Sequence, residues 1–253
     1  MAWPCMVLAT ILFGSTPAAD GISATREIRE QHPDSLEIQA WTNRVIGSLI
    51  ALQGDETTGR ELLEEARSMF AELGHHEALA AHPFSTAPLE LRAGNPAAAE
   101  RELRAGLEIL EGTGERARAG HLAALLAGVL AQQGRLDEAD EYLAVARETI
   151  QAIDVSGLAQ LKISTARVLA LRGELEEAVR LAAEAAALID GAQELLNMPD
   201  LLMWQAEVLE LAGSVEDAKA ALTKAVDAAV RKGSVVGAAL ATERLAALET
   251  SEH

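Results

Sequence analysis

The chain has 253 residues, with 21 lysines and arginines against 39 aspartates and glutamates, so its formal net charge is −18. Hydrophobic residues make up 49% but aromatic residues only 3%, which favours an alanine- and leucine-filled core of close-packed helices. The acidic balance argues against nucleic acid and anionic membrane surfaces as partners, because both attract lysine and arginine. The single cysteine, Cys5, excludes an internal disulfide and a cysteine-based zinc site.

The chain begins with an apolar run over residues 6–13 that is similar to the core of a secretion signal. No lysine or arginine precedes Arg26, so the charged start of such a signal is missing, and the run is too short to span a bilayer. We therefore expect a cytoplasmic protein in which residues 1–34 are a truncated first repeat. Because residue 1 then lies inside a helix, we expect a fragment of a longer protein or a late start codon.

A glycine recurs along the chain at intervals of 40, 40, 40, 39 and 40 residues. In most units a small residue follows five positions later and another seven further on. The pattern predicts two helices per unit: the first ends at a left-handed glycine cap, and the small residues let the helices cross closely. Acidic groups after the glycine suit the positive end of the second helix. The recurring glycines are Gly14, Gly54, Gly94, Gly134, Gly173 and Gly213.

Further breaks end the second helices and divide the chain into units. A helical pair cannot bury its apolar face alone, so the units must stack into one domain in which each touches its sequence neighbours. The predicted breaks are Gly74, Gly114, Asp154, Gly191 and Gly233. The predicted units after the truncated repeat are 35–74, 75–114, 115–154, 155–193 and 194–233, followed by a capping helix and polar tail over 234–253.

Units such as LAQQGRLDEADEYLAVARETI and LALRGELEEAVRLAAEAAALI resemble the tetratricopeptide repeat (TPR). Their period of about 40 exceeds the usual period of about 34, and is similar to that of the C-terminal repeat region of bacterial class III adenylate/guanylate cyclases and ATP-dependent transcription activators. The resemblance runs from Gly14 to Glu249 and implies an all-α, right-handed superhelical solenoid of about six helix–turn–helix repeats with a C-terminal capping helix. No GxxxxGK[ST] loop is present, so neither cyclase nor ATPase activity is implied.

Several positions depart from the repeat pattern. Gly59 and Gly106 stand where alanine is usual, at a cost of roughly 1 kcal/mol each inside a helix, and Arg26 replaces a small residue. Pro83 and Pro88 fall inside a predicted first helix. They must break or kink it, because proline lacks an N–H and clashes with the preceding turn.

Neither a metal site nor a catalytic motif is indicated. His75, His76 and His82 form the only histidine cluster, but adjacent histidines on a helix point in different directions and their spacing matches no known metal site. Acidic strings early in helices are explained by the helix dipole and by solubility. We therefore expect no enzymatic activity, no cofactor and no metal.

The TPR resemblance implies that first helices line a concave surface, where the residues 13, 10 and 6 positions before each glycine face a ligand. Tryptophan and arginine are enriched at binding hot spots, which favours Trp41 and Arg44. An equally strong alternative is that Trp41 and Phe84 only pack between repeats. The predicted partner-binding residues are Trp41, Arg44, Ser48, Phe84, His121, Gln160, Arg167, Asp200, Met203 and Glu207.

These observations predict a non-catalytic protein–protein interaction scaffold that binds a helix or peptide on its concave surface. The partner is a separate protein or other domains of a larger parent protein. One alternative is a regulatory or sensor module of a larger bacterial cyclase or ATP-dependent transcription regulator, which changes curvature when it binds an effector. A second alternative is an enzyme with its site inside the superhelix. That role needs a deep pocket with converging polar groups, which the sequence does not reveal.

Overall fold

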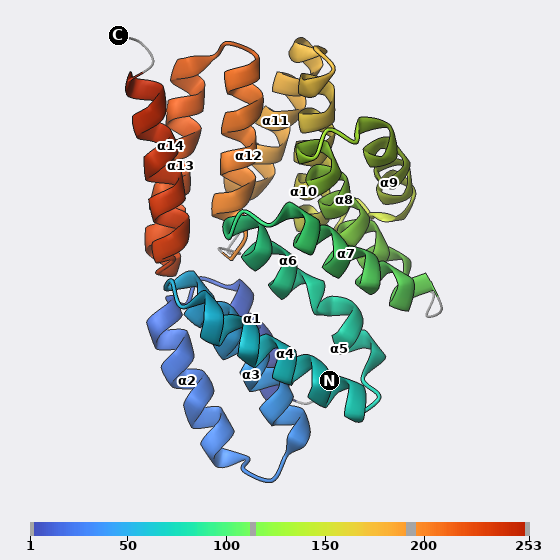
Figure 1. Ribbon diagram of the computed structural model, residues 1–253, viewed down its shortest axis with the longest axis vertical. Coiled ribbons are helices and arrows are strands. Elements are labelled where there is room, and N and C mark those ends of the chain that lie inside the picture. Colours follow the sequence, from blue (N-terminus) through green and yellow to red (C-terminus); the bar gives the residue numbers. More distant parts are fainter. Residues whose placement is uncertain (1–2, 112–114, 191–195, 251–253) are drawn as a thin grey trace.

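The computed structural model describes residues 3–111, 115–190 and 196–250, which form fourteen α-helices and no strand. Helices that follow one another pair through short turns, and the pairs lie side by side along the chain (Figure 1). The predicted all-α solenoid of helical repeats is confirmed. Gly114, Gly191 and the polar tail over 251–253 lie outside the described residues.

The helices fall into two sets according to their place in each pair. The first helices are α1 (Trp3–Phe13), α3 (Leu36–Leu52), α5 (His76–Ala81) with α6 (Pro83–Arg92), α8 (Arg116–Gln132), α10 (Val155–Leu171) and α12 (Met198–Leu211). The second helices are α2 (Ala18–Gln31), α4 (Glu56–Glu72), α7 (Pro96–Glu111), α9 (Leu136–Thr149), α11 (Leu175–Asp190) and α13 (Val215–Lys232), and α14 (Val235–Thr250) follows them.

Left-handed glycines make the turns inside the pairs, with one exception. The prediction of such a cap at Gly14 is wrong: Gly14 has no positive φ, and its N–H donates to the carbonyl of Thr10 at 2.9 Å. Ordinary helical backbone therefore leads out of α1. The cap glycines for which the prediction is confirmed, with φ between 75° and 102°, are Gly54, Gly94, Gly134, Gly173 and Gly213.

Small residues set the close crossing of the α3–α4 pair. A Cβ placed on Gly47 would lie 2.9 Å from the carbonyl oxygen of Gly59, and a Cβ placed on Gly59 would lie 2.8 Å from the Cβ of Ala51. Both distances are well inside van der Waals contact. Glycine at position 59 departs from the repeat pattern because the two backbones leave no room for a methyl group.

The break predicted at the prolines is confirmed at Pro83, since α5 ends at Ala81 and α6 begins at Pro83. Pro88 lies inside α6, which continues past it to Arg92. The ring of Pro83 occupies space beside α7, where a Cβ on Gly106 would lie 2.7 Å from the proline Cγ. The second departure from alanine in the pattern therefore accommodates the kinked first helix of the same pair.

The two ends of the solenoid meet, so the expectation that units touch only their sequence neighbours is wrong at this place. Lys232 at the end of α13 is completely buried, and its Nζ donates to the carbonyls of Ile11, Gly14 and Thr16 at 3.0, 2.9 and 3.0 Å. Burial lowers the pKa of Lys232 to about 8. The side chain is therefore still an ammonium at pH 7, with three N–H groups for three carbonyls at the negative end of α1.

Further contacts support this closure. Arg92 on α6 forms an ion pair with Asp200 on α12 at 2.6 Å and donates to the carbonyl of Leu196 at 3.2 Å. Leu196 in turn packs into the apolar cluster of α1 and α3. The last helix, α14, contacts α3 and α6 as well as α13, and Figure 1 shows α13 and α14 returning to the side of α1 and α2.

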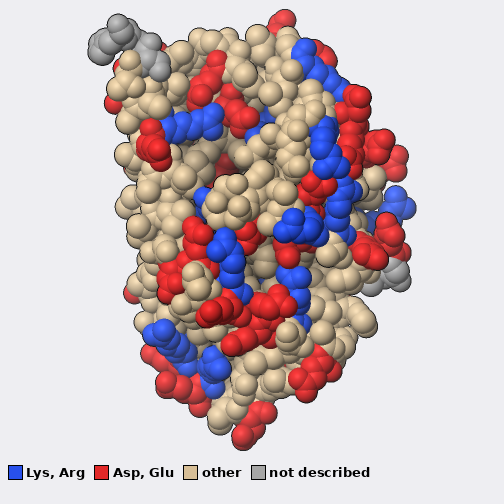
Figure 2. Space-filling model, in the orientation of Figure 1, with Lys and Arg blue, Asp and Glu red and all other residues tan. Residues whose placement is uncertain are grey.

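Ion pairs join successive repeats across the surface. Arg104 on α7 pairs with Glu138 in the first turn of α9, and Arg172 pairs with Asp137 in the same turn at 3.0 Å. The first-turn acids thus complement the helix dipole, as predicted, and also bridge repeats. Figure 2 shows basic and acidic side chains lying beside one another over this face. Exposed pairs of this kind contribute about 0–1 kcal/mol each.

Within the described ranges, no helix combines the length and the apolar character needed to cross a bilayer.

Replacing Gly106 by alanine tests the fit between the kinked helix and α7. Alanine favours a helix over glycine by about 1 kcal/mol. We nevertheless expect Gly106→Ala to lower the free energy of unfolding by about 1–3 kcal/mol, because the new Cβ overlaps the ring of Pro83. In a Pro83→Ala background the loss is smaller, and urea denaturation of the four proteins gives the coupling energy. Equal losses in both backgrounds would contradict this account of position 106.

Replacing Lys232 by methionine tests the closure of the ends. The variant loses three hydrogen bonds from an ammonium, so we expect the free energy of unfolding to fall by about 2 kcal/mol and the radius of gyration in solution scattering to rise. The matched control is Lys224→Met, because Lys224 lies on the same helix and forms an exposed pair with Asp190 at 3.2 Å. If both variants keep wild-type stability and size, other contacts hold the ends together.

Candidate functional site

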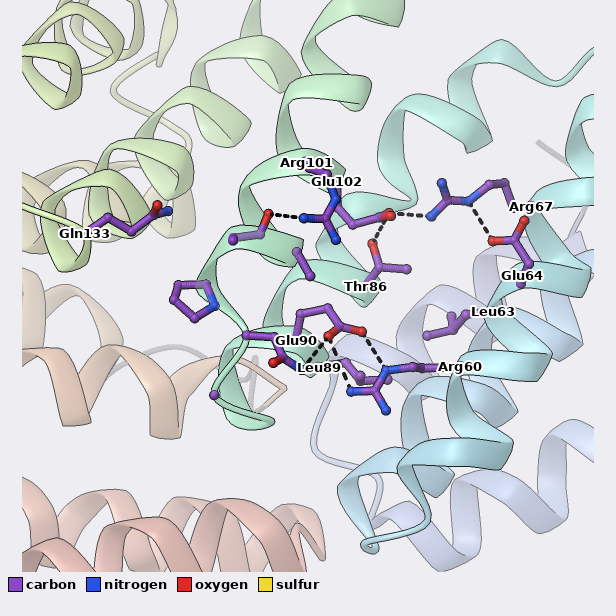
Figure 3. Close-up of a pocket in the computed structure, with 15 residues that line it drawn as sticks. Arg60, Leu63, Glu64, Arg67, Thr86, Leu89, Glu90, Arg101, Glu102 and Gln133 are labelled. Atoms are coloured by element: carbon purple, nitrogen blue, oxygen red, sulfur yellow. Dashed lines mark hydrogen bonds and ion pairs between the residues drawn. The ribbon is translucent and has the colours of Figure 1, made fainter. Parts of the chain in front are cut away.

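A cavity of about 690 Å³ lies beside α4, α6 and α7 and is bridged by ion pairs (Figure 3). Arg60 pairs with Glu90 at 2.6 Å, and Arg67 pairs with Glu102 and, at 3.4 Å, with Glu64. The remaining arginine on its wall, Arg101, is exposed and donates to a carbonyl of its own helix. This cavity therefore offers a ligand no unpaired buried charge.

A second cavity, of about 570 Å³, lies where the first helices α1, α3, α5, α6 and α8 converge, and we call it the inner cavity. Four of the ten predicted binding residues line it together. They are Trp41 and Arg44 from α3, Phe84 from α6 and His121 from α8. The structure thus brings residues from three consecutive repeats to one place.

The aromatic walls of the inner cavity also pack between helices. The ring of Trp41 meets the ring of Phe70 edge to face at 5.1 Å, and the ring of Phe84 meets that of His121 in the same way at 4.9 Å. The two interpretations of Trp41 and Phe84, as packing groups and as lining groups, therefore both apply. Rings held in this way are rigid and present a preformed apolar surface.

Arg44 supplies the buried positive charge of the inner cavity. It is only 2% exposed; its Nε donates to the hydroxyl of Ser85 at 3.0 Å and its Nη2 to the carbonyl of Ala81 at 2.7 Å. The guanidinium carbon lies 5.4 Å from the centre of the Trp41 ring. Burial, and then the charge of Arg118, lower the pKa of Arg44 to about 10, so it remains charged at neutral pH.

The other polar groups of the inner cavity are weaker or already engaged. Arg118 forms an ion pair with Glu115 at 2.6 Å, and the imidazole of His75 lies 3.9 Å from Glu37. Burial lowers the pKa of His121, so that its ring is neutral at pH 7. The side-chain oxygen of Asn197 is buried and has no hydrogen-bond partner among the described residues.

Two of the predicted binding residues in the C-terminal half form a buried bridge. Arg167 is 2% exposed, donates to the carbonyl of Gly128 and pairs with Glu207, both at 2.7 Å. Its guanidinium carbon lies 4.3 Å from the centre of the Trp204 ring. Arg167 and Glu207 therefore join three repeats and lie apart from the inner cavity.

The remaining four predicted residues also make internal contacts. Ser48 donates to the carbonyl of Arg44 at 2.8 Å, and Gln160 donates to Ser164 at 3.1 Å beside a cavity of only about 40 Å³. Asp200 is the partner of Arg92 in the closure, and Met203 packs against two of the apolar clusters of the C-terminal repeats.

Two residues of the inner cavity wall were not predicted from the repeat spacing. Phe13 of α1 and Asn197, which precedes α12, both line the inner cavity. Neither has the spacing of 13, 10 or 6 from a repeat glycine that pointed to the other residues, and no local signal marks them. Asn197 lies next to the closure contact between Arg92 and Leu196, whereas Phe13 belongs to α1, which packs on α3.

No family model and no curated protein matches the chain. Among solved structures, it is similar to NprR in complex with its cognate peptide NprX, with a TM-score of 0.68 and 17% identity over 98% of this chain and 71% of that chain. It is also similar to BtubC (BKLC) from P. vanneervenii, with a TM-score of 0.56 and 18% identity over 90% and 91% of the two chains. These similarities show a TPR-like helical-repeat fold.

A buried histidine lies at the break between α5 and α6, next to the residue that holds Arg44. His82 is 2% exposed, and neither ring nitrogen has a hydrogen-bond partner. Burial, followed by the charges of Arg44 and Arg67, lowers the pKa of His82 well below 6.5. The ring is therefore neutral at pH 7, beside two guanidinium groups.

This histidine predicts a loss of stability in acid. As the pH falls through about 6.5, the unfolded chain binds a proton that His82 in the folded chain does not, so the free energy of unfolding decreases. We expect His82→Leu to flatten the decrease between pH 6.5 and 5, measured by urea denaturation at each pH. The exposed His76 provides the control: His76→Gln keeps the wild-type dependence. An unchanged slope in His82→Leu would assign the acid sensitivity to other groups.

Proposed function

We propose that this chain is a non-catalytic binding scaffold that holds a peptide or helix of a partner protein in the inner cavity. The observation that carries the proposal is the inner cavity itself: about 570 Å³ with rigid aromatic walls, contributed by three repeats. Such a concave, mostly apolar wall with a few polar groups is the usual form of a binding site. The solved structure of NprR, which shares the fold, holds a peptide.

The chemistry of the wall supports binding rather than catalysis. Of the described residues that line the inner cavity, none is a serine, threonine or cysteine that could act as a nucleophile. Arg118, which also lines the inner cavity, is paired with Glu115. In the described part of the chain, no three histidine, cysteine or acidic side chains converge as metal ligands would.

A second candidate function is a regulatory module of a larger bacterial signalling protein, as the resemblance to cyclase-associated repeats implies. The closure of the solenoid favours it, because a few contacts join repeats that are distant in sequence: Lys232 donates to the end of α1, and the Arg92–Asp200 pair joins α6 to α12. A ligand in the inner cavity touches α1, α3 and α8 and would bias the curvature that these contacts hold.

Selection from a displayed library of random peptides on the full chain tests the proposal. We expect enriched peptides whose affinity, measured by fluorescence polarisation, falls about 10- to 100-fold in Trp41→Ala, as at other aromatic hot spots. Tyr142→Ala is the control, since Tyr142 is also a partly buried aromatic but packs on α7 and α8 away from the inner cavity. No enriched peptide, or peptides that bind Trp41→Ala and wild type equally, would contradict the proposal.

A further inference from the structure

Arg44 and Arg167 are two buried arginines with similar surroundings that differ in their ion pairing. Each is 2% exposed, each lies over a tryptophan ring, and each donates to a carbonyl of a neighbouring repeat at 2.7 Å. Arg167 also has a carboxylate partner, Glu207. Arg44 has the neutral hydroxyl of Ser85 in place of a carboxylate, and no carboxylate of the described chain lies within ion-pair distance of it.

A buried cation without an ion-pair partner lowers the stability of the fold, because its removal from water is not offset by a direct ion pair. A role as a structural bracket between α3 and the α5–α6 break accounts for the two hydrogen bonds of Arg44, but not for the missing carboxylate. The placement of the two arginines differs in one further respect: Arg44 lines the inner cavity, whereas Arg167 lines none of the cavities described above. The buried arginine without an ion-pair partner is therefore the one that lines a cavity with room for a ligand.

One nitrogen of Arg44 is still available. Nε and Nη2 donate to Ser85 and Ala81, while Nη1 has no hydrogen-bond partner among the described residues. Nη1 is not fully buried, so it keeps some accessible surface. Arg44 can therefore donate to a group inside the cavity without giving up the bonds that hold its side chain in place.

The rest of the wall limits the anion to one of low charge with an apolar body. Phe13, Trp41 and Phe84 supply apolar surface around Arg44. Glu37 and Glu77 also line the cavity, and their charges oppose a second negative group on the ligand. A single buried guanidinium beside two carboxylates suits a carboxylate, with one negative charge, better than a phosphate with two.

We propose that the inner cavity binds a carboxylate joined to an aromatic or other apolar group, with the carboxylate accepting from Arg44. Two sources share this chemistry: the C-terminal residue of a peptide and a free organic acid of similar size. This inference rests on the proposed binding role of the same cavity and names the chemistry of its ligand.

The test compares acids with their amides on the full wild-type chain by isothermal titration calorimetry. The probes are the peptide Ala-Ala-Ala-Phe and 3-phenylpropanoate, each with a free carboxylate and as the carboxamide. We expect each acid that binds to do so about 10- to 100-fold more tightly than its amide, the effect of a hydrogen bond to a charged group. Tighter binding of the peptide acid identifies a chain terminus as the ligand, and equal or tighter binding of 3-phenylpropanoate identifies a free acid.

Two variants assign the preference to the site. Arg44→Gln keeps a donor for Ala81 but no charge, and we expect it to bind acid and amide equally. Arg101→Gln, in the other cavity, keeps the wild-type preference. If Arg44→Gln fails to fold by circular dichroism, Ala9→Leu takes its place: it fills the inner cavity from α1 without touching Arg44, and we expect it to weaken binding of the acids at least about tenfold.

The outcomes separate this inference from the proposed function. If the wild-type chain binds acid and amide equally and Trp41→Ala binds neither, the inference that the ligand carries a carboxylate is wrong. The proposed binding of a peptide in the inner cavity is still supported. Absence of binding by all four probes overturns the carboxylate inference, while peptides enriched from the library would still support the binding role. Acetate binding as tightly as 3-phenylpropanoate would show that the ligand needs no apolar group. An acid preference that persists in Arg44→Gln, or undiminished binding of the acids in Ala9→Leu, would show that they bind elsewhere.

Discussion

The close crossing of two helices is the constraint on which the rest of the structure depends. At the α3–α4 crossing a single added Cβ would lie within 3 Å of the opposite helix, so the spacing of small residues decides which faces meet. Because the spacing recurs every 39 or 40 residues, each pair stacks on the last in the same way. First helices from successive repeats then converge, and the inner cavity forms between their side chains.

Closure of the solenoid converts this stack into a site with walls on more than one side. Lys232 satisfies three carbonyls at the end of α1, and the Arg92–Asp200 pair joins α6 to α12. The hydrogen bond from Arg92 to the carbonyl of Leu196 holds the neighbouring Asn197 at the wall of the inner cavity, whereas α1 packs directly on α3. An open superhelix would present Trp41 and Phe84 on a shallow surface, whereas the closed one surrounds a volume that can take part of a peptide or a small ligand.

The two halves of the molecule differ in how a buried arginine is paired. Around Arg167 the guanidinium meets a carboxylate, a carbonyl and an aromatic ring, so its positive charge has an opposite charge beside it. Around Arg44 the carbonyl and the ring are present and the carboxylate is absent. A buried charge without its partner is destabilising, and this is the physical basis of our proposal that a ligand binds beside Arg44.

The sequence by itself determined the helical class, the stacking of paired helices, the cap glycines other than Gly14 and the break at Pro83. These features depend on local backbone preferences and on the spacing of residues along the chain, which can be read from the sequence directly. The sequence also pointed to Trp41, Arg44, Phe84 and His121 through that spacing. Only the tertiary structure decided that the ends meet, that Arg167 has a carboxylate partner and Arg44 has none, and that Phe13 and Asn197 join the wall. Those features depend on residues up to 221 positions apart, and no local pattern encodes which distant charges will be buried together.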